Sequence, residues 1–265
     1  MSGQPTRMAA GSPQGSRHAQ NKSLLVQAAF VVVLLALWWL GTHQWGINRL
    51  LLPKPEDVWR ELVDIVLSGE FVPDLLVTLG ELAAAFAISM TAGVTLGFLL
   101  SRSRYLIAVF EPLLAGLYAI PIILFLPLYI LLFGLGPLSK IALGATISFF
   151  PVVLNTIAGF GNVDAIHVTA ARSMGASPWA LFRYVLLPAA FPVILTGLRM
   201  GFTVALLSII GSETIASLAG LGHRIVHLAE AMEMARMFAY IVFVVGIAAG
   251  LNSAVSALEA RGRRH

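Results

Sequence analysis

The sequence contains no cysteine and few charged residues. Without cysteine, the chain has no disulfide framework, no thiol nucleophile and no cysteine-based metal site. Charged residues make up 11% of its 265 residues and hydrophobic residues 58%, whereas a soluble domain carries about 25% charged and roughly 45–50% apolar residues. Such a chain lacks the charge to cover a water-facing surface, and its long apolar runs indicate a membrane protein.

Motifs for nucleotide and metal chemistry are also missing. The sequence has no G-x-x-x-x-G-K-[ST] phosphate loop and no H-E-x-x-H zinc motif. Its net charge of +4 comes from residues at the ends of apolar segments, without the basic patch and interleaved aromatic residues of a nucleic-acid-binding protein. These absences argue against ATP binding by this chain itself, against a membrane metalloenzyme and against nucleic-acid binding.

Apolar runs of about 20 residues, the length that crosses a bilayer, predict an all-α protein with about six transmembrane helices. One of these runs, 105–132, is interrupted by Pro112, Pro121 and Pro127, so it forms either one kinked span or two shorter ones. One kinked span gives the more consistent charge topology. The predicted spans are 23–43, 75–100, 105–132, 139–160, 189–212 and 237–258.

Positive charges favour an orientation with both termini in the cytoplasm. Residues 1–22 are rich in Ser, Gly, Gln and Pro and are predicted to form a disordered cytoplasmic tail, and 259–265 form a basic one. A signal peptide is the alternative for the N-terminus, but no small-residue cleavage pattern follows the first apolar run. The inner segments would hold Arg7, Arg17, Lys22, Arg102, Arg104, Arg172, Arg183, Arg261, Arg263 and Arg264, and the outer ones Arg49, Lys54, Arg60, Lys140, Arg224 and Arg236.

Two segments outside the spans have helical patterns. The outer loop 44–74 has apolar residues at helical spacing with acidic residues between them, which predicts a short amphipathic helix at the membrane interface. The longest inner segment, 161–188, predicts two helices joined by a tight turn. The first would run from Ala165 to Met174 and end at Gly175. The second would start at Ser177 as N-cap and run toward Pro188.

The inner segment resembles the EAA loop of ABC importer permeases, which has two alanines, a glycine four positions later and a Leu-Pro about a dozen residues further on. Thr169 stands where that motif has glutamate. The segments LPKPEDVWREL, LLSRSRYL, FFPVVLNTIAG and LPAAFPVILTGLRMG resemble the nitrate/sulfonate/taurine permease group. The residues assigned to the coupling loop by this resemblance are Thr169, Ala170, Ala171, Gly175, Ala176, Leu187 and Pro188.

This resemblance implies a type I ABC importer permease of the bacterial inner membrane, which is a transport subunit and not an enzyme. Two permease chains, expected to be a homodimer, would form the path and bind no cofactor. Two ATPase subunits, which bind ATP and Mg²⁺, would dock on 161–188, and a periplasmic or lipid-anchored binding protein would deliver the substrate. A small anion or sulfonate-like solute is implied, such as nitrate, taurine, an alkanesulfonate or bicarbonate. The alternative is a secondary transporter or channel without an ATPase, although no internal repeat is apparent.

Carboxylates within the spans are the other candidate functional residues, because an intramembrane charge is costly unless it is functional or paired. Glu213, beside Ser212 near the outer end of the fifth span, either lines the substrate path or pairs with Arg199 or Arg224 as a structural lock. Glu81 stands where the resembling group has a basic residue, and neither it nor Glu111 receives a definite role.

Two further patterns favour structural interpretations. His223, His227 and Glu230 share a helical face with zinc-ligand spacing, but two ligands four residues apart are common by chance, so no metal site is predicted. Gly93 and Gly97 form a small-xxx-small pair. We expect this pair to serve core packing rather than a dimer seam.

Overall fold

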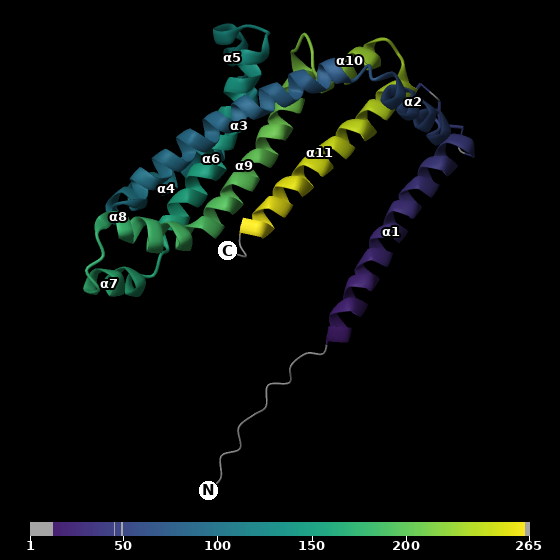
Figure 1. The fold of residues 1–265 in the computed structure, drawn as a ribbon. Helices are drawn as coiled ribbons and strands as arrows, with labels where there is room; N and C mark the ends of the chain where they lie inside the picture. The colour runs from purple at the N-terminus through teal and green to yellow at the C-terminus, as the bar shows by residue number, and fades with distance from the viewer. Residues whose placement is uncertain (1–12, 45, 49, 263–265) are drawn as a thin grey trace. The chain divides into compact units, whose positions relative to one another are not determined.

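The computed structural model describes residues 13–44, 46–48 and 50–262, which are almost entirely helical (Figure 1). Contacts divide the chain into two units, Met1–Trp59 and Arg60–His265. The second unit contains most of the apolar helices and the sites described below. No β-strand occurs in these described ranges.

The first unit contains helix α1, Pro13–His43. Helix α1 begins at Pro13 rather than at residue 23, so 13–22 extend the helix instead of forming the predicted tail; residues 1–12 lie outside the described residues. Proline fits the first turn of a helix, and extending a helix that is already nucleated costs little. The apolar side chains of α1, such as Leu25 and Val32, are exposed, as expected for a helix that faces lipid.

Helix α2, Pro55–Ser68, confirms that the predicted amphipathic segment is helical. Val58 and Ile65 are buried, whereas Trp59 and Leu67 are exposed. Its position at the membrane interface stays a prediction.

Five helices in the described part of the chain are long and apolar enough to cross a membrane, and a bent pair makes up to six, which confirms the predicted number. The first piece of the bent pair is α4, Arg104–Tyr118. The second piece is the 3₁₀ helix η1, Ile122–Phe125, continued by α5, Leu126–Phe133. The two pieces meet at a bend of 70°. The bend lies at Pro121, which cannot donate a backbone hydrogen bond and disfavours helical geometry in the residue before it. Residues 105–132 therefore form two helical pieces; that they make one span stays a prediction.

The remaining long helices are α3, Val72–Ser101; α6, Pro137–Gly161; α9, Leu187–Ile215; and α11, Met234–Gly262. Each extends a few residues beyond the predicted apolar run, because backbone hydrogen bonds continue into polar sequence. The first residues of the predicted basic tail 259–265 accordingly belong to α11, and 263–265 lie outside the described residues. Helix α10, Leu221–Glu230, connects α9 to α11.

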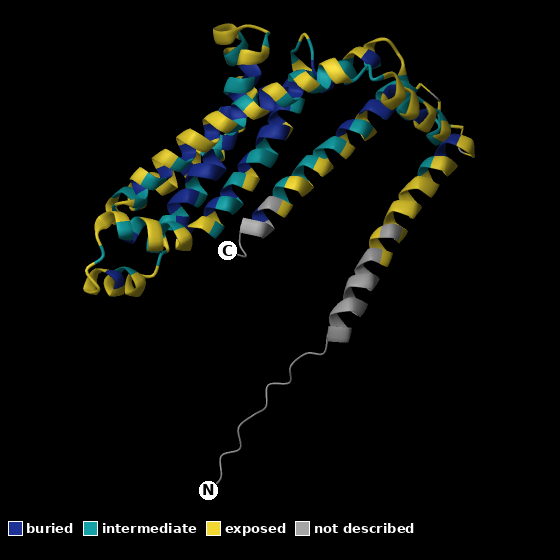
Figure 2. Ribbon diagram, in the orientation of Figure 1, coloured by how far each residue is buried: buried dark blue, intermediate teal, exposed yellow. Residues whose placement is uncertain are grey.

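Helices α3, α6 and α9 pack closely through glycines and form the core of the second unit, seen as the dark blue faces in Figure 2. A Cβ atom at Gly97 of α3 would lie 2.6 Å from the Thr156 Cβ of α6. A Cβ atom at Gly201 of α9 would lie 2.6 Å from the Val152 Cγ2 of α6. Gly93 also faces Val152, so the predicted core packing of the α3 glycine pair is confirmed.

Candidate functional site

The inner segment folds as the sequence predicts, into two helices joined at a glycine. Helix α7, Ala165–Ser173, begins where Asp164 Oδ1 accepts a 2.9 Å hydrogen bond from the Ile166 N–H. Gly175 has φ +79°, a left-handed conformation that glycine adopts at low cost. Ser177 Oγ accepts a 3.2 Å hydrogen bond from the Ala180 N–H and starts helix α8, Pro178–Leu181.

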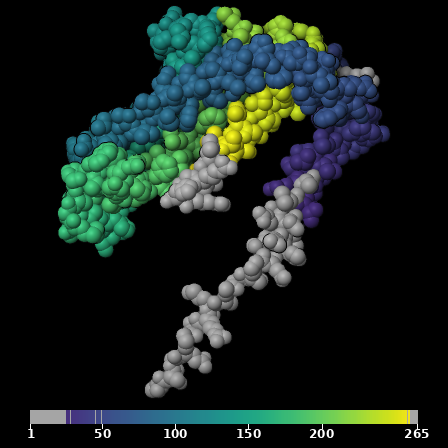
Figure 3. Space-filling model, in the orientation of Figure 1, coloured from purple at the N-terminus to yellow at the C-terminus, as the bar shows by residue number. Residues whose placement is uncertain are grey.

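The second of these helices does not end near Pro188, as the sequence had suggested. A π-helical turn, η2 (Phe182–Leu186), joins α8 to α9, so one continuous helix runs over Pro178–Ile215. Proline lacks the N–H that a regular helix needs, and a π turn is one way to accommodate the change in hydrogen bonding. The coupling segment is therefore fused to a membrane span, and Figure 3 shows it in green at one end of the second unit.

The residues assigned to the coupling loop differ in exposure. Ala171 is buried, and Ala176 and Leu187 are half-buried. The exposed members are Thr169, Ala170, Gly175 and Pro188. Ala171 thus packs inside the chain, while Thr169 and Ala170 are free to meet a partner.

Large apolar side chains on the surface of this segment were missed by the sequence analysis. The exposed fractions are 68% for Ile166, 81% for Met174, 69% for Trp179 and 76% for Tyr184. Exposed apolar groups gathered within one short segment mark an interaction surface. The sequence could have indicated this surface, because large apolar residues recur along 161–188, a segment that is predicted to lie outside the membrane spans.

At the other end of the core, Glu213 is held by hydrogen bonds rather than by an arginine. Only 1% of it is exposed. Thr78 Oγ1 donates to Glu213 Oε1 at 2.7 Å, and the Gly222 N–H donates to Oε2 at 2.8 Å. Both carboxylate oxygens are therefore engaged within the protein.

These contacts cap the first turn of α10. The N–H groups of 220–222 donate in turn to Asp74 Oδ1 at 3.1 Å, to Thr78 Oγ1 at 3.0 Å and to Glu213 Oε2 at 2.8 Å. Negative charge at a helix N-terminus is favourable because of the helix dipole. Side chains of α3 and α9 thus fix the start of α10. Ser212 is buried next to Glu213, and its hydroxyl donates to the Ile209 carbonyl oxygen of the same helix at 2.9 Å.

The arginines considered as partners of Glu213 lie elsewhere. Arg199 Nη1 is 3.3 Å from Glu259 Oε2, and its side chain is 44% exposed. Arg224 Nη2 is 3.6 Å from Glu70 Oε2. The structure therefore does not bring Glu213 together with either arginine.

Glu81 and Lys140 join Glu213 in a buried polar cluster. Their exposed fractions are 3% and 0%, and the charges of Glu81 and Glu213 both act on Lys140. Lys140 Nζ donates to the carbonyl oxygens of Leu135 and Gly136. The positive charge near Glu81 is thus supplied by α6, in a chain that has Glu81 where a basic residue was expected.

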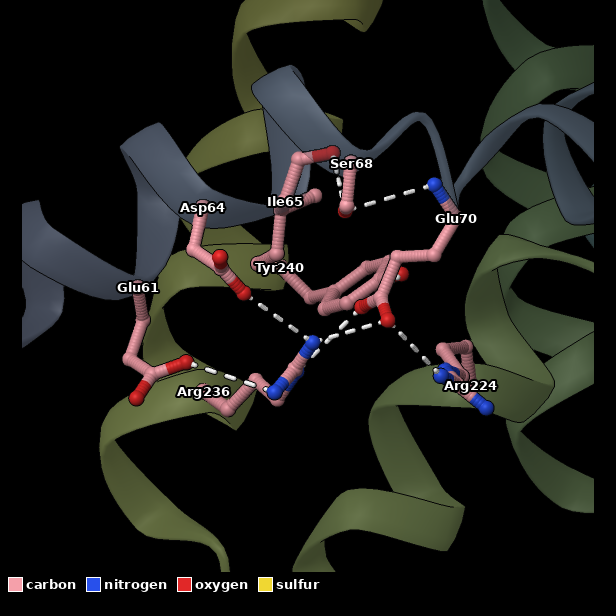
Figure 4. Close-up of polar contacts among 8 residues, drawn as sticks. All are labelled: Glu61, Asp64, Ile65, Ser68, Glu70, Arg224, Arg236 and Tyr240. Atoms are coloured by element: carbon pink, nitrogen blue, oxygen red, sulfur yellow. Dashed lines mark hydrogen bonds and ion pairs between the residues drawn. The ribbon is translucent and has the colours of Figure 1, made fainter.

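Glu70, between α2 and α3, is the centre of a second polar cluster, shown in Figure 4. Arg236 Nη2 donates to Glu70 Oε2 at 2.7 Å and the Tyr240 hydroxyl donates to Oε1 at 3.0 Å. Arg236 also lies 3.6 Å from Glu61 and 3.4 Å from Asp64, both on α2. The cluster therefore ties α2 to the start of α11.

The pKa of Glu70 is set by opposing effects. Burial raises it, but the hydrogen bonds from Arg236 and Tyr240 and the charges of Arg236 and Arg224 lower it more, so the net pKa is below the ordinary 4.5. The carboxylate is therefore charged at neutral pH.

His223 and His227 lie on α10 with ring centroids 6.3 Å apart, and among the described residues no group of three or more His, Cys, Asp or Glu side chains is placed to hold a metal ion.

A bundle of long apolar helices, with one of them extended into an exposed apolar segment, defines an integral membrane protein with a surface for a partner. The chain belongs to the family of binding-protein-dependent transport system inner membrane components, whose model matches residues 89–264. It is 29% identical over 246 residues to the taurine transport system permease protein TauC of Escherichia coli (strain K12), covering 91% of this chain and 90% of that one. It is 30% identical over 247 residues to the putative aliphatic sulfonates transport permease protein SsuC of Bacillus subtilis (strain 168), covering 93% and 88%.

Solved structures show the same fold. An amino acid ABC transporter with histidines superposes with a TM-score of 0.60 at 22% identity, over 77% of this chain and 97% of that chain. The MetNI methionine ABC transporter in an inward-facing conformation gives a TM-score of 0.60 at 18% identity, over 71% and 93%. The chain is thus the transmembrane permease subunit of an ABC importer, a membrane protein that works with an ATPase and a substrate-binding protein.

Proposed function

We propose that this permease imports a small sulfonate or a related small anion. The observation that carries the proposal is the similarity to TauC and SsuC along about nine-tenths of each chain, because the first is named for the transport of taurine, an aminosulfonate, and the second for that of aliphatic sulfonates. Arg199 supports it from the structure: its side chain remains 44% exposed within α9 although Glu259 lies beside it. An arginine at membrane depth is stable when it faces protein or a water-filled path rather than lipid.

The test is uptake by cells that express the permease with its ATPase and binding protein and lack other sulfonate importers. Labelled taurine, an alkanesulfonate, nitrate and bicarbonate are compared. We expect sulfonate uptake in the complete system, and a several-fold loss in Arg199→Gln relative to Arg60→Gln, which alters an exposed arginine of α2 outside the coupling segment. Uptake of nitrate or bicarbonate alone would contradict the sulfonate assignment.

We propose further that two ATPase subunits, which bind ATP and Mg²⁺, dock on the exposed apolar residues of the coupling segment. Burying these side chains against a partner is favourable by about 25 cal/mol per Å² of apolar surface. Helix Pro178–Ile215 then passes the movement to the core, since no loop interrupts it. A secondary transporter would purify without an ATPase, so co-purification from a strain that expresses all subunits separates the two functions.

A homodimer is the proposed assembly of the permease. The face of α3 opposite its packed glycines carries Ala87, Thr91 and Thr95, and these residues line a shallow, open depression on the surface of this helix. Threonine hydroxyls and small side chains suit close helix contact or a water-lined path. Native mass measurement should give two copies of this chain with two ATPases, and a single copy per complex would contradict the proposal.

A further inference from the structure

A cavity of about 370 Å³ lies between the coupling segment and the C-terminal ends of α3 and α6. Its walls come from the C-terminal ends of α3 and α6 and from α7, α8 and η2. Its polar side is formed by Ser101, Arg102 and Arg172. The apolar lining residues are Phe98, Phe160, Val168, Pro178, Leu181, Phe182 and Leu186. This volume falls within the range of small-molecule sites, about 300–1,000 Å³.

The charge around the cavity is strongly positive. Segments 98–107 and 161–187 contain four arginines and one acidic residue, Asp164, whose side chain caps α7. In the part of the chain that the structure describes, neither Arg102 nor Arg172 has an acidic partner within salt-bridge distance. Guanidinium groups bind phosphate oxygens through paired hydrogen bonds, so the two arginines suit a phosphate group.

The other side of the cavity is aromatic. The ring centroids of Phe98 and Phe160 lie 5.1 Å apart, as do those of Phe98 and Phe182, and the Arg102 guanidinium lies 5.8 Å from the Phe98 ring centroid. A free inorganic anion would leave the apolar side of the cavity unfilled. A molecule with an anionic head and an apolar tail would use both sides, and Leu99 on the adjoining surface of α3 is 48% exposed.

We propose that this cavity binds the headgroup of an anionic phospholipid from the cytoplasmic leaflet. The assignment to that leaflet rests on the proposed orientation with both termini inside. The phosphate lies between Arg102 and Arg172, and the start of the acyl chains lies against Phe98 and Phe182. Because Arg102 follows α3 and Arg172 belongs to α7, the lipid joins the coupling segment to the spans. Basic pockets between helix ends at the cytoplasmic side are suited to such headgroups.

The test compares the full-length permease with the double variant Arg102→Gln/Arg172→Gln. Arg104→Gln/Arg183→Gln is the matched control, since it removes two exposed arginines that do not line the cavity. Each protein is purified from membranes that contain phosphatidylglycerol, and native mass spectrometry measures the retained lipid. Wild type and control should retain phosphatidylglycerol over phosphatidylcholine by about tenfold, because both lipids carry the phosphate but the choline cation of phosphatidylcholine is repelled by the two arginines. The double variant should lose this preference.

The consequence for coupling is measured on the complex with its ATPases in nanodiscs. ATP hydrolysis by wild type should be several-fold higher in phosphatidylglycerol than in phosphatidylcholine, and the double variant should be insensitive to the lipid. Equal lipid retention by all three proteins would overturn the proposal. Restoration of hydrolysis in phosphatidylcholine by inorganic phosphate alone would also overturn it in favour of a free anion site. Loss of ATPase binding by the double variant in every lipid would assign the cavity to the ATPase contact instead.

Lipid retention is measured on the permease chain without its partners. It therefore tests the cavity even if the proposed substrate or stoichiometry fails.

Discussion

Replacing Gly175 by valine should uncouple the permease from its ATPase while leaving the membrane core intact. Gly175 has φ +79° and directly follows the last turn of α7, where its N–H donates to the Arg172 carbonyl oxygen at 3.0 Å. A Cβ atom at this position would meet nothing within 4 Å. The substitution therefore adds backbone strain and no steric clash with the rest of the protein.

The magnitude follows from that geometry. A residue with a side chain in the left-handed region costs about 1–2 kcal/mol relative to glycine, and a β-branched residue stands at the upper end. About 2 kcal/mol shifts the equilibrium between the closed turn and other conformations by about 30-fold. That is a large change for a turn between two short helices, but it leaves the packed contacts of α3, α6 and α9 untouched.

The assay is ATPase co-purification, substrate uptake and substrate-stimulated ATP hydrolysis at matched membrane expression. All three should fall steeply in Gly175→Val, and Gly175→Asn should recover part of each, because asparagine tolerates the left-handed conformation. Gly69→Val is the matched control: Gly69 has φ +69° and equally open space, but lies between α2 and α3. Normal docking and uptake in Gly175→Val, or an equal loss in Gly69→Val, would refute the coupling role of this turn.

Four further outcomes are expected. Trp179→Ala should weaken ATPase binding without lowering permease expression, because it removes a side chain that is 69% exposed on the proposed contact surface. Glu213→Gln should lower the unfolding temperature of the purified permease by a few degrees, because an amide nitrogen replaces one of the two oxygens that accept from Thr78 and Gly222 and leaves a buried donor unsatisfied, at a cost of about 1–3 kcal/mol. Cysteine at Asp57 should react with an impermeant reagent in whole cells, and cysteine at Ser177 should not. Acidification below pH 4.5, the ordinary pKa of a glutamate carboxyl, should destabilise the protein through Glu70, whose pKa in the folded state is lower. The charged carboxylate contributes its full stabilisation above pH 4.5, and this stabilisation is lost as the pH falls through the lowered pKa.

Each of these outcomes has a matched comparison. Leu67→Ala removes an 81% exposed side chain from α2, and ATPase binding should be unchanged. Glu230→Gln alters an exposed carboxylate of α10, and a loss of stability equal to that of Glu213→Gln would remove the cap interpretation. Reversed labelling of the two cysteines would overturn the proposed orientation. Glu70→Gln should flatten the acid dependence, and an unchanged dependence would assign it to other groups.

The sequence was sufficient for the features that depend on local pattern. Apolar run length predicted the spans, and the Ser177-Pro178 pair together with Gly175 predicted the turn between the inner helices, because capping and left-handed geometry are properties of a few adjacent residues. The amphipathic pattern likewise predicted α2. These features needed no knowledge of the tertiary structure.

Features that depend on contacts between distant segments could not be predicted. The partners of Glu213 are Thr78, which is 135 residues away, and a backbone N–H group of α10. Neither Arg199 nor Arg224, the two ion-pair partners considered from the sequence, is therefore the partner of Glu213. The polar cluster of Glu70 and Arg236 joins positions 166 residues apart. The π turn before Pro188 was also missed, since an apolar Leu-Pro reads equally well as a helix end or as a helix that continues.

The uninterrupted helix Pro178–Ile215 has 38 residues and is therefore about 57 Å long. A helix of that length acts as a lever, and a tilt of about 5° around its midpoint would displace each end by about 2.5 Å in opposite directions. The π turn at Phe182–Leu186 is the place near the inner end where such a helix bends most readily. If that turn stays straight, motion of the coupling segment reaches the capped start of α10. If it bends, the motion is lost at the turn and does not reach the rest of the helix. The stiffness of these five residues therefore determines how much of the motion made by the ATPase is transmitted along the helix.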